Sequence, residues 1–175
     1  MGVTTFRGLQ VGDAARVLDA FVSDAAEMSR QGDVHDLDTA RASVSRMRDN
    51  PETHTLVAAD DADRLLAFAA VSVDRDNANG WVFYWAHPDA RRRGITSQLV
   101  RALADRELGE GGLHRLELGY RANNPGSAAV ARAAGFVREG LEREKFLVDG
   151  RRVDVVTAAR LRTDPSPDSL ASISS

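Results

Sequence analysis

The apolar run from Leu65 to Val73 is the feature that most constrains the fold, because only Ser72 interrupts it. A strand with apolar side chains on both faces is typical of a sheet interior that is covered on both sides. The following residues, Asn77 to Gly80, are turn formers, and a second apolar segment runs from Trp81 to Ala86. The sequence therefore predicts a buried antiparallel hairpin.

The residues before this hairpin predict two helices and two further strands. A helix beginning at Asp13 has one apolar face, because its apolar residues recur three and four positions apart. A second helix is expected from Asp38 to Arg48, ended by Asn50-Pro51. The expected strands are Thr4 to Gln10 and His54 to Ala59, and the second of these completes an antiparallel meander with the hairpin.

The residues after the hairpin predict a strand, helix, strand unit and then a final hairpin. A helix from about Gly94 carries Ile or Leu every four residues and ends near Gly109. Strict alternation predicts a strand from Leu113 to Tyr120. The remaining segments are expected to be a helix from Pro125 to Ala134 and strands from Phe136 to Val148 and from Arg151 to Leu161.

These elements predict an α/β (α+β) fold, with a mixed, mostly antiparallel sheet of six to seven strands flanked by about four helices. We expect a single domain over residues 1–163. Residues 164–175 are rich in Pro and Ser, and they are predicted to be a disordered tail.

Composition excludes several classes of site. The chain of 175 residues has no cysteine, which rules out a disulfide scaffold, a thiolate metal site and a cysteine nucleophile. Its four histidines stand at no metal-ligand spacing, so no metal is expected. Neither a secretory signal nor a run of roughly 20 apolar residues is found, and a cytoplasmic protein without membrane contact is expected. The pI of about 5.8 argues against nucleic-acid binding.

The formal net charge of -3 hides an asymmetry along the chain. Residues 1–90 carry 8 Arg against 15 Asp and Glu, a balance of -7, whereas residues 91–175 carry 15 basic against 11 acidic residues, a balance of +4. One interpretation is a scatter of solvated charges. The other is that the two halves hold ligands of opposite sign.

An anion-binding loop is predicted where the segment Arg91-Arg92-Arg93-Gly94-Ile95-Thr96-Ser97 opens a helix. The first N–H groups of a helix lack intrahelical partners, and the helix dipole favours an anion there. Gly94 leaves room for a close approach, while the hydroxyls of Thr96 and Ser97 and the guanidinium groups add donors. This pattern indicates a diphosphate site that needs no metal. The alternative is a solvated basic cluster, and the spacing matches neither a P-loop nor a dinucleotide fingerprint.

Three stretches in order carry a family resemblance: YWAHPDARRRGITSQLVRAL at residues 84–103, NPGSAAVARAAGF at residues 124–136 and EGLEREKFLVDGRRVDVV at residues 139–156. Together they resemble the GNAT superfamily of N-acetyltransferases, specifically its RimJ/RimL-type branch. The resemblance covers residues 54–162, whereas the first 50 residues match only in their strand, helix, helix layout. It implies a GNAT-like fold and acetyl-CoA as the co-substrate.

The resemblance also implies which residues hold acetyl-CoA. The family's Gln/Arg-x-x-Gly-x-Gly/Ala element falls on Arg91, Gly94 and Thr96, and the amides around these residues would hold the pyrophosphate. Thr96 departs from the usual Gly or Ala. The strand end Trp85-Ala86-His87 would splay from the next strand and pair with the pantetheine amides. Asn124 and Ser127 would contact the cofactor beyond its diphosphate.

Candidate catalytic residues follow from the reaction that the resemblance implies. Without cysteine, direct attack by the amine in a ternary complex is the simplest mechanism. Ala131 stands where many GNAT enzymes carry a tyrosine acid, and the resemblance then suggests Ser127 as the acid, although a hydroxyl at a helix start is equally natural. For the base, we single out Glu117, with Tyr84 as an alternative. Further candidates are Glu142 and Glu144, whose charged segment is also typical of a solvated strand face.

Two further expectations concern the packing of these strands. Trp81, Phe83 and Trp85 share one strand face and are expected in the core rather than in an aromatic substrate cage. Asp154 interrupts an apolar strand, and a buried acid there would require a partner such as an arginine.

The leading functional hypothesis is an acetyl-CoA-dependent N-acetyltransferase that acts on a primary amine. The acceptor could be a protein N-terminus, a peptide-like compound or a small amine, and the acidic first half favours a cationic one. An alternative is a catalytically silent acyl-CoA-binding module that senses acetyl-CoA or regulates a partner. Acetylation of an antibiotic in self-resistance differs only in the acceptor. A homodimer is left open.

Overall fold

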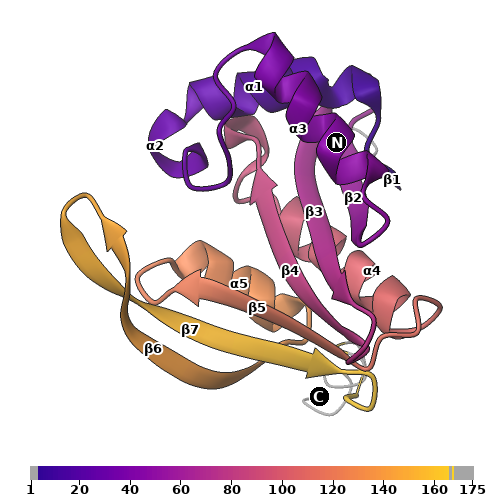
Figure 1. The fold of residues 1–175 in the computed structure, drawn as a ribbon, viewed down its shortest axis with the longest axis vertical. Coiled ribbons are helices and arrows are strands. Elements are labelled where there is room, and N and C mark those ends of the chain that lie inside the picture. The colour runs from indigo at the N-terminus through magenta and orange to yellow at the C-terminus, as the bar shows by residue number, and fades with distance from the viewer. Residues whose placement is uncertain (1–3, 166, 168–175) are drawn as a thin grey trace.

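The computed structural model describes residues 4–165 and 167, and within them seven strands form one sheet in the order β1-β2-β3-β4-β5-β7-β6 (Figure 1). The strands are β1 (Thr5–Arg7), β2 (Thr53–Ala59), β3 (Leu65–Asp74), β4 (Asn79–Ala86), β5 (Arg115–Arg121), β6 (Val137–Val148) and β7 (Arg151–Leu161). The helices are α1 (Ala14–Ser23), α2 (Ala25–Met28), α3 (Leu37–Asp49), α4 (Ile95–Leu108) and α5 (Pro125–Ala133). Short 3-10 turns span Val11–Asp13 and Pro88–Ala90.

All neighbouring strands are antiparallel except β4 and β5, which run parallel. The predicted fold class of a mixed, mostly antiparallel sheet flanked by helices is therefore confirmed. Most predicted elements begin and end within two residues of the observed ones. The first strand is shorter than predicted, and α2, a single turn of four residues, was not predicted.

Helices cover both faces of the central strands, as the apolar run in β3 requires. Side chains alternate along a strand, so neighbouring residues enter opposite cores. On one face α4 packs on β3 with a core that includes Val71, Leu99 and Leu103. On the other face α1 and α3 pack on β3 with a core that includes Phe21 and Phe68. Seven of the ten residues of β3 in succession, Leu65 to Val71, are buried.

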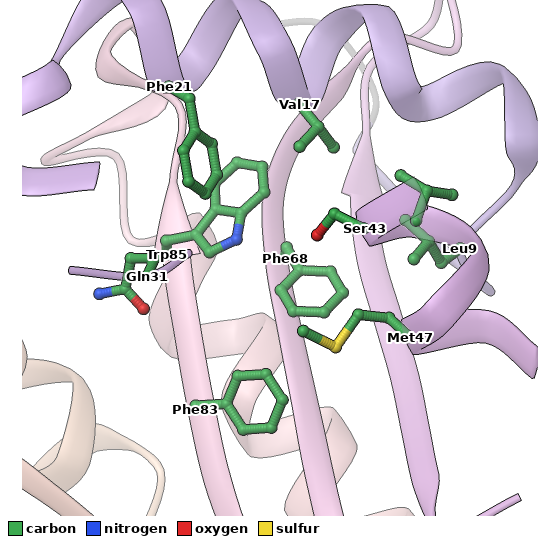
Figure 2. A pocket seen from close by; sticks show the side chains of 10 residues that line it. Leu9, Val17, Phe21, Gln31, Ser43, Met47, Phe68, Phe83 and Trp85 are labelled. Atoms are coloured by element: carbon green, nitrogen blue, oxygen red, sulfur yellow. The ribbon is translucent and has the colours of Figure 1, made fainter. Parts of the chain in front are cut away.

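The core under α1 and α3 is rich in aromatic rings (Figure 2). The ring of Trp85 stacks on Phe68 with centroids 5.7 Å apart and meets Phe21 edge-on at 6.0 Å. Phe83 approaches Phe68 at 6.1 Å. Side chains from these strands and helices also line a small, mainly apolar cavity. The expected core position is thus observed for Phe83 and Trp85, which pack against this cluster.

Trp81 does not share the core position that the strand alternation predicted. Its side chain is 42% exposed, and it joins neither core cluster of the described residues. The reason is the reach of the helices: α1 and α3 cover the part of β4 that holds Phe83 and Trp85, whereas the start of the strand extends past them (Figure 1).

Asp154 also differs from its expectation. The residue is only half-buried, and its Oδ1 accepts a hydrogen bond from the backbone N–H of Glu144 at 2.8 Å rather than from an arginine. Glu144 has a φ of 53° and lies within a register irregularity of β6. Asp154 therefore fixes a β-bulge, because it binds a backbone donor that the ladder leaves free.

Two buried charged groups join elements far apart in the chain. Arg160 of β7 donates to the carbonyl of Ala134 at 3.0 Å and to Oδ1 of Asp105 at 2.6 Å, which ties β7 to the ends of α4 and α5. Glu107 of α4 is 2% exposed and lies 2.6 Å from Nδ1 of His54 on β2. Burying such charges is costly unless they are paired, and both are paired.

No helix in the described part of the chain is long and apolar enough to cross a membrane. Of the predicted tail, residues 166 and 168–175 lie outside the described residues.

Gly80 yields a stability prediction, because side chains from β3 and β5 pack closely against it. An ideal Cβ at Gly80 would overlap Cγ1 of Val71 and lie 2.9 Å from Cδ2 of Leu116. We expect Gly80→Ala to lower the free energy of unfolding by about 1–3 kcal/mol, as overpacking does. Urea denaturation followed by circular dichroism measures this change.

The matched control is Gly12→Ala, since nothing lies within 4 Å of a Cβ at that position. This variant should change the free energy of unfolding by less than about 1 kcal/mol. Equal effects at the two glycines would contradict the close packing described for Gly80.

Candidate active site

The most unusual feature of the sheet is a gap between β4 and β5. The two strands pair over only three residues, Asn79 to Trp81 with Arg115 to Glu117, and then diverge (Figure 1). Beyond Trp81, β4 remains paired with β3 and β5 remains paired with β7. One edge of each strand therefore faces the gap.

The hydrogen-bond pattern shows which backbone groups point into this gap. The N–H of His87 donates to the carbonyl of Leu66, so in β4 the odd-numbered residues bond toward β3. Tyr84 and Ala86 then direct their N–H and C=O groups toward β5. Because the N–H of Ala122 donates to Asp154, the even-numbered residues of β5 bond toward β7. The odd residues Gly119 and Arg121 therefore direct their backbone groups toward β4.

This pattern divides the predicted segment Trp85-Ala86-His87. Of these three residues, only Ala86 presents its backbone polar groups to the gap. Tyr84, two residues earlier, does the same. The backbone groups of Trp85 and His87 face β3, and the Trp85 ring is part of the core. The backbone groups of Tyr84 and Ala86 therefore line the gap, whereas the contacts predicted for Trp85 and His87 would have to come from groups that face β3.

The side chain of His87 is 2% exposed and is held on both ring nitrogens. Nδ1 lies 3.2 Å from the N–H of Asp89 and 3.1 Å from a guanidinium nitrogen of Arg16, both donors, so Nδ1 accepts. Nε2 then carries the proton and donates to Asp19 at 3.0 Å. This hydrogen bond lowers the pKa of Asp19 below its usual value. The imidazole thereby anchors the start of the 3-10 turn that leads toward α4.

The predicted anion loop lies at the start of α4. Gly94 is the N-cap residue of this 14-residue helix and has a φ of 74°, a conformation that favours glycine. No side chain caps the helix, so its first N–H groups are left for another acceptor. Thr96 and Ser97 are half-buried in the first turn, and Ile95 is buried beneath it. The start of α4 is therefore open to an anion.

The three arginines before Gly94 are exposed and differ in their contacts. Arg91 forms an ion pair with Asp24, which joins α1 to α2. Arg92 and Arg93 have no ion pair within the described residues, and Arg92 has a φ of 59°. At least two guanidinium groups beside the open helix start are thus available to an anion such as a diphosphate.

Asn124 and Ser127 lie together at the start of α5. Oδ1 of Asn124 accepts the backbone N–H of Ser127 at 3.0 Å, so this side chain caps the helix. The hydroxyl of Ser127 has no hydrogen-bond partner among the described residues and is half-buried. Tyr84 reaches the same turn from β4, since its hydroxyl donates to the carbonyl of Ser127 at 3.3 Å. The structure thus brings Ser127 to the gap on the α5 face of the sheet.

Burial raises the pKa of Tyr84 to about 12. Its phenol is therefore neutral at physiological pH and can donate a hydrogen bond. A tyrosine acts as a general base only as the phenolate, and the raised pKa makes the phenolate of Tyr84 scarce. This property disfavours Tyr84 as a general base.

Glu117 lies on the other face of the sheet, opposite Trp81 at the closed end of the gap. Its side chain is 39% exposed and accepts a hydrogen bond from Nε of Arg115 at 2.5 Å. Arg115 also forms an ion pair with Glu139, and it lowers the pKa of Glu139. A single guanidinium is therefore shared between two carboxylates.

The two other candidate bases belong to the exposed strand β6. Glu142 is engaged by Nζ of Lys145 at 2.5 Å, and Glu144 contributes its backbone to the bulge at Asp154. Neither lies on β4 or β5, where the gap is formed. Among the described residues no group of His, Asp and Glu could hold a metal ion.

Comparisons with known proteins identify the family. The model of the acetyltransferase (GNAT) family matches residues 18–136, which span the helices of the first half, the gap and α5. The chain belongs to the GNAT family. A segment of 72 residues is 36% identical to the probable N-acetyltransferase YjcK of Bacillus subtilis strain 168, covering 41% of this chain and 40% of that protein. The similarity thus spans less than half of the length of that relative.

Solved GNAT structures share the fold over most of the chain. RimL, a ribosomal L7/L12 α-N-protein acetyltransferase in complex with coenzyme A, superposes with a TM-score of 0.80 and 19% identity, covering 90% of this chain and 93% of that one. A chimera of the spermidine N-acetyltransferase SpeG from Vibrio cholerae and hSSAT gives a TM-score of 0.78 and 19% identity, covering 91% and 96%. At this level of identity the likeness concerns the GNAT fold itself.

The raised pKa of Tyr84 predicts how this GNAT chain titrates in alkali. The folded pKa of about 12 lies above the ordinary tyrosine value of about 10, so folding favours the neutral phenol, and this stabilisation is lost as the pH rises through the folded pKa. At a pH of about 11, roughly a tenth of Tyr84 should be ionised, against about nine-tenths of an ordinary phenol. The ultraviolet difference spectrum between the native protein and Tyr84→Phe measures that fraction.

Far-ultraviolet circular dichroism over the same pH range verifies that the protein is still folded. If Tyr84→Phe removes a phenolate that forms with a midpoint near pH 10 in the folded protein, the burial of this hydroxyl is contradicted.

Proposed function

We propose that this GNAT-family chain transfers an acetyl group from acetyl-CoA to a primary amine, by direct attack of the amine while both substrates are bound. The observation that carries the proposal is the gap between β4 and β5, which has unpaired backbone groups on both sides and leads toward the uncapped start of α4. A long ligand with amides along its arm and a diphosphate at one end fits this combination. Membership of the GNAT family supports the same conclusion.

The residues that would hold acetyl-CoA lie at the two ends of this gap and along it. The backbone N–H groups of residues 95–97 and the guanidinium groups of residues 91–93 would bind the diphosphate. The backbone groups of Tyr84 and Ala86 would pair with the amides of the arm. Asn124 and Ser127 would contact it from the start of α5. When bound, acetyl-CoA supplies the activated acetyl group as a thioester.

The proposed acid and base lie on opposite faces of the sheet. Ser127 approaches the gap on the α5 face, while Glu117 lies on the face opposite it. As the new N–C bond forms and the C–S bond breaks, the amine loses a proton to Glu117, directly or through a water molecule. The departing sulfur takes a proton through the hydroxyl of Ser127, which regains one from solvent, and Glu117 releases its extra proton to solvent. This separation lets the amine enter on one face while the thiol leaves on the other.

Tyr84 would position the acid rather than transfer a proton itself. Its neutral hydroxyl holds the carbonyl of Ser127 and so fixes the first turn of α5 beside the gap. Asn124 holds the backbone N–H of the same residue. Ser127 is thus fixed at both its backbone N–H and its carbonyl, while its hydroxyl is unengaged by the described residues.

The acceptor is proposed to be a protein N-terminus, a peptide-like compound or a small cationic amine. The chain itself is proposed to belong to the RimJ/RimL-type branch of the family. Two structural neighbours are described as acting on a ribosomal protein N-terminus and on spermidine, and these acceptors share a primary amine. Acetylation of an antibiotic amine would use the same chemistry. The face that carries Glu117 is the surface from which the acceptor would approach.

A silent acyl-CoA-binding module is the second candidate, and two observations favour it. Ala131 offers no proton at the position of the family's tyrosine, and the carboxylate of Glu117 is already engaged by Arg115. Such a protein would bind acetyl-CoA as described above but would release no thiol with any amine.

Binding of acetyl-CoA can be measured by isothermal titration calorimetry. Gly94→Glu should weaken binding by about ten-fold or more, because it places a carboxylate where the diphosphate is expected and strains a residue with positive φ. Gly112→Glu is the matched control, since Gly112 has a φ of 76° with no atoms within 4 Å of a Cβ. Equal affinities of the two variants would refute the anion site at α4.

Turnover can be measured by thiol release over a panel of amines and by mass spectrometry of the products. Ser127→Ala should lower kcat by about a hundred-fold, as loss of a general acid does, and should leave the Kd for acetyl-CoA within about three-fold. Glu117→Gln should lower kcat by about a hundred-fold, as loss of a general base does. Unchanged turnover in both variants would exclude these roles, and thiol release by no amine would favour the silent module.

A further inference from the structure

The exposed indole of Trp81 lies at the point where the proposed reaction would occur. Trp81 is the last residue of β4 that pairs with β5, so it marks the closed end of the gap. The far end of the same gap leads to the start of α4, where the diphosphate is proposed to bind. An arm that runs down the gap from α4 therefore points its reactive end toward Trp81. The indole lies on the face of the sheet opposite to α5. The amine is proposed to approach from this same face.

A glycine on the neighbouring strand sets the position of the ring. An ideal Cβ at Gly119 of β5 would lie 3.3 Å from Cη2 and 3.5 Å from Cζ2 of Trp81, so the indole rests directly on the backbone of β5. Val155 of β7 borders the same spot, because its Cγ1 would be 3.2 Å from that Cβ. One side of the ring rests on β5, and the residue remains 42% exposed to solvent.

The charged groups around Trp81 carry an excess of carboxylates. Glu117 is directly opposite Trp81 on β5 and shares Arg115 with Glu139, so two carboxylates face one guanidinium. Asp74 lies on the same face at the turn of the β3–β4 hairpin, and its carboxylate accepts a hydrogen bond from the neutral side chain of Asn77. The balance on this part of the face is therefore negative.

We infer that Trp81 is the specificity-determining platform for the acceptor, and that the acceptor carries a second positive charge besides the amine that is acetylated. The inference rests on the proposed function. The face of an indole attracts a cation electrostatically, and nearby carboxylates add to this attraction. The amine that reacts must be neutral, so it gains nothing from such a surface at the moment of attack. A second, protonated amine gains from it throughout.

This assignment separates possible acceptors by their charge. A diamine such as putrescine keeps one ammonium group at neutral pH when the other is deprotonated, because alkylamines titrate near pH 10. An acceptor with a phosphate near the amine would be repelled by the carboxylates around Trp81. A monoamine of the same chain length would reach the thioester but leave the indole unoccupied.

Equilibrium binding tests the platform without requiring turnover. The chain has two tryptophans, so Trp81→Phe leaves Trp85, a core residue, as the only indole. With coenzyme A present to fill the cofactor site, putrescine should change the tryptophan fluorescence of the native protein, and this change should vanish in Trp81→Phe. A change that persists in Trp81→Phe would place the diamine elsewhere and overturn the inference. So would calorimetric binding of putrescine with no change in the fluorescence of the native protein.

Kinetics with two matched substitutions separate recognition from packing. Trp81→Phe keeps an aromatic face, whereas Trp81→Leu keeps an apolar side chain on Gly119 but removes the face. We expect Trp81→Leu to raise the KM for putrescine by about five- to thirty-fold and that for n-butylamine by less than about two-fold. Trp81→Phe should raise the KM for putrescine by less than about five-fold.

The outcomes distinguish this inference from the proposed function. Equal increases of KM for the diamine and the monoamine in Trp81→Leu would overturn the platform while leaving acetyl transfer intact. If neither amine causes thiol release, the proposed acetyl transfer to these amines is contradicted. The fluorescence titration then tests separately whether Trp81 binds the diamine. As a control for the exposed apolar surface, Val137→Ala on β6, 60% exposed and away from β4, should leave both KM values unchanged.

Discussion

The site depends on one constraint of backbone chemistry: a strand edge that has no neighbour must find another partner for its N–H and C=O groups. In this protein β4 and β5 meet for three residues and then separate in the interior of the sheet. The two strands stay apart because, beyond their last shared pair, β4 remains hydrogen-bonded to β3 and β5 remains hydrogen-bonded to β7. Tyr84, which reaches from β4 to α5, spans the opening on one face. The gap is therefore a stable part of the fold with an unmet requirement for hydrogen bonds.

Much of this architecture could be predicted from the sequence, because its elements are defined locally. The apolar run at Leu65 to Val73 and the strict alternation at Leu113 to Tyr120 each predict an element without knowledge of its neighbours. The glycine at position 94 and the small residues around Ser127 likewise mark helix starts by local chemistry. The resemblance to the GNAT superfamily then ordered these elements in one sheet. The GNAT fold class and the start of α4 can thus be predicted from the sequence alone.

What could not be predicted depends on contacts between distant residues. Trp81, Phe83 and Trp85 have the same alternation, yet only the last two are covered, since coverage depends on where α1 and α3 end in space. The pairing of His54 with Glu107 joins residues 53 positions apart. His87 follows a strand that was expected to face the ligand, but its ring is sequestered by Asp19 from α1. The charge asymmetry between the halves also weakens in three dimensions, because Asp24 and Glu27 pair with Arg91 and Arg121 of the other half.

The bulges of β6 have a consequence for the behaviour of the protein in solution. This strand is twelve residues long, forms one border of the sheet and exposes Leu141, Phe146 and Leu147. A flat border of that length and composition would template the addition of a strand from another molecule. Two interruptions of its register, one of them fixed by Asp154, bend the border and break the regular row of donors and acceptors. By fixing one of these interruptions, the half-buried Asp154 of β7 makes the neighbouring strand a poorer template for such an addition.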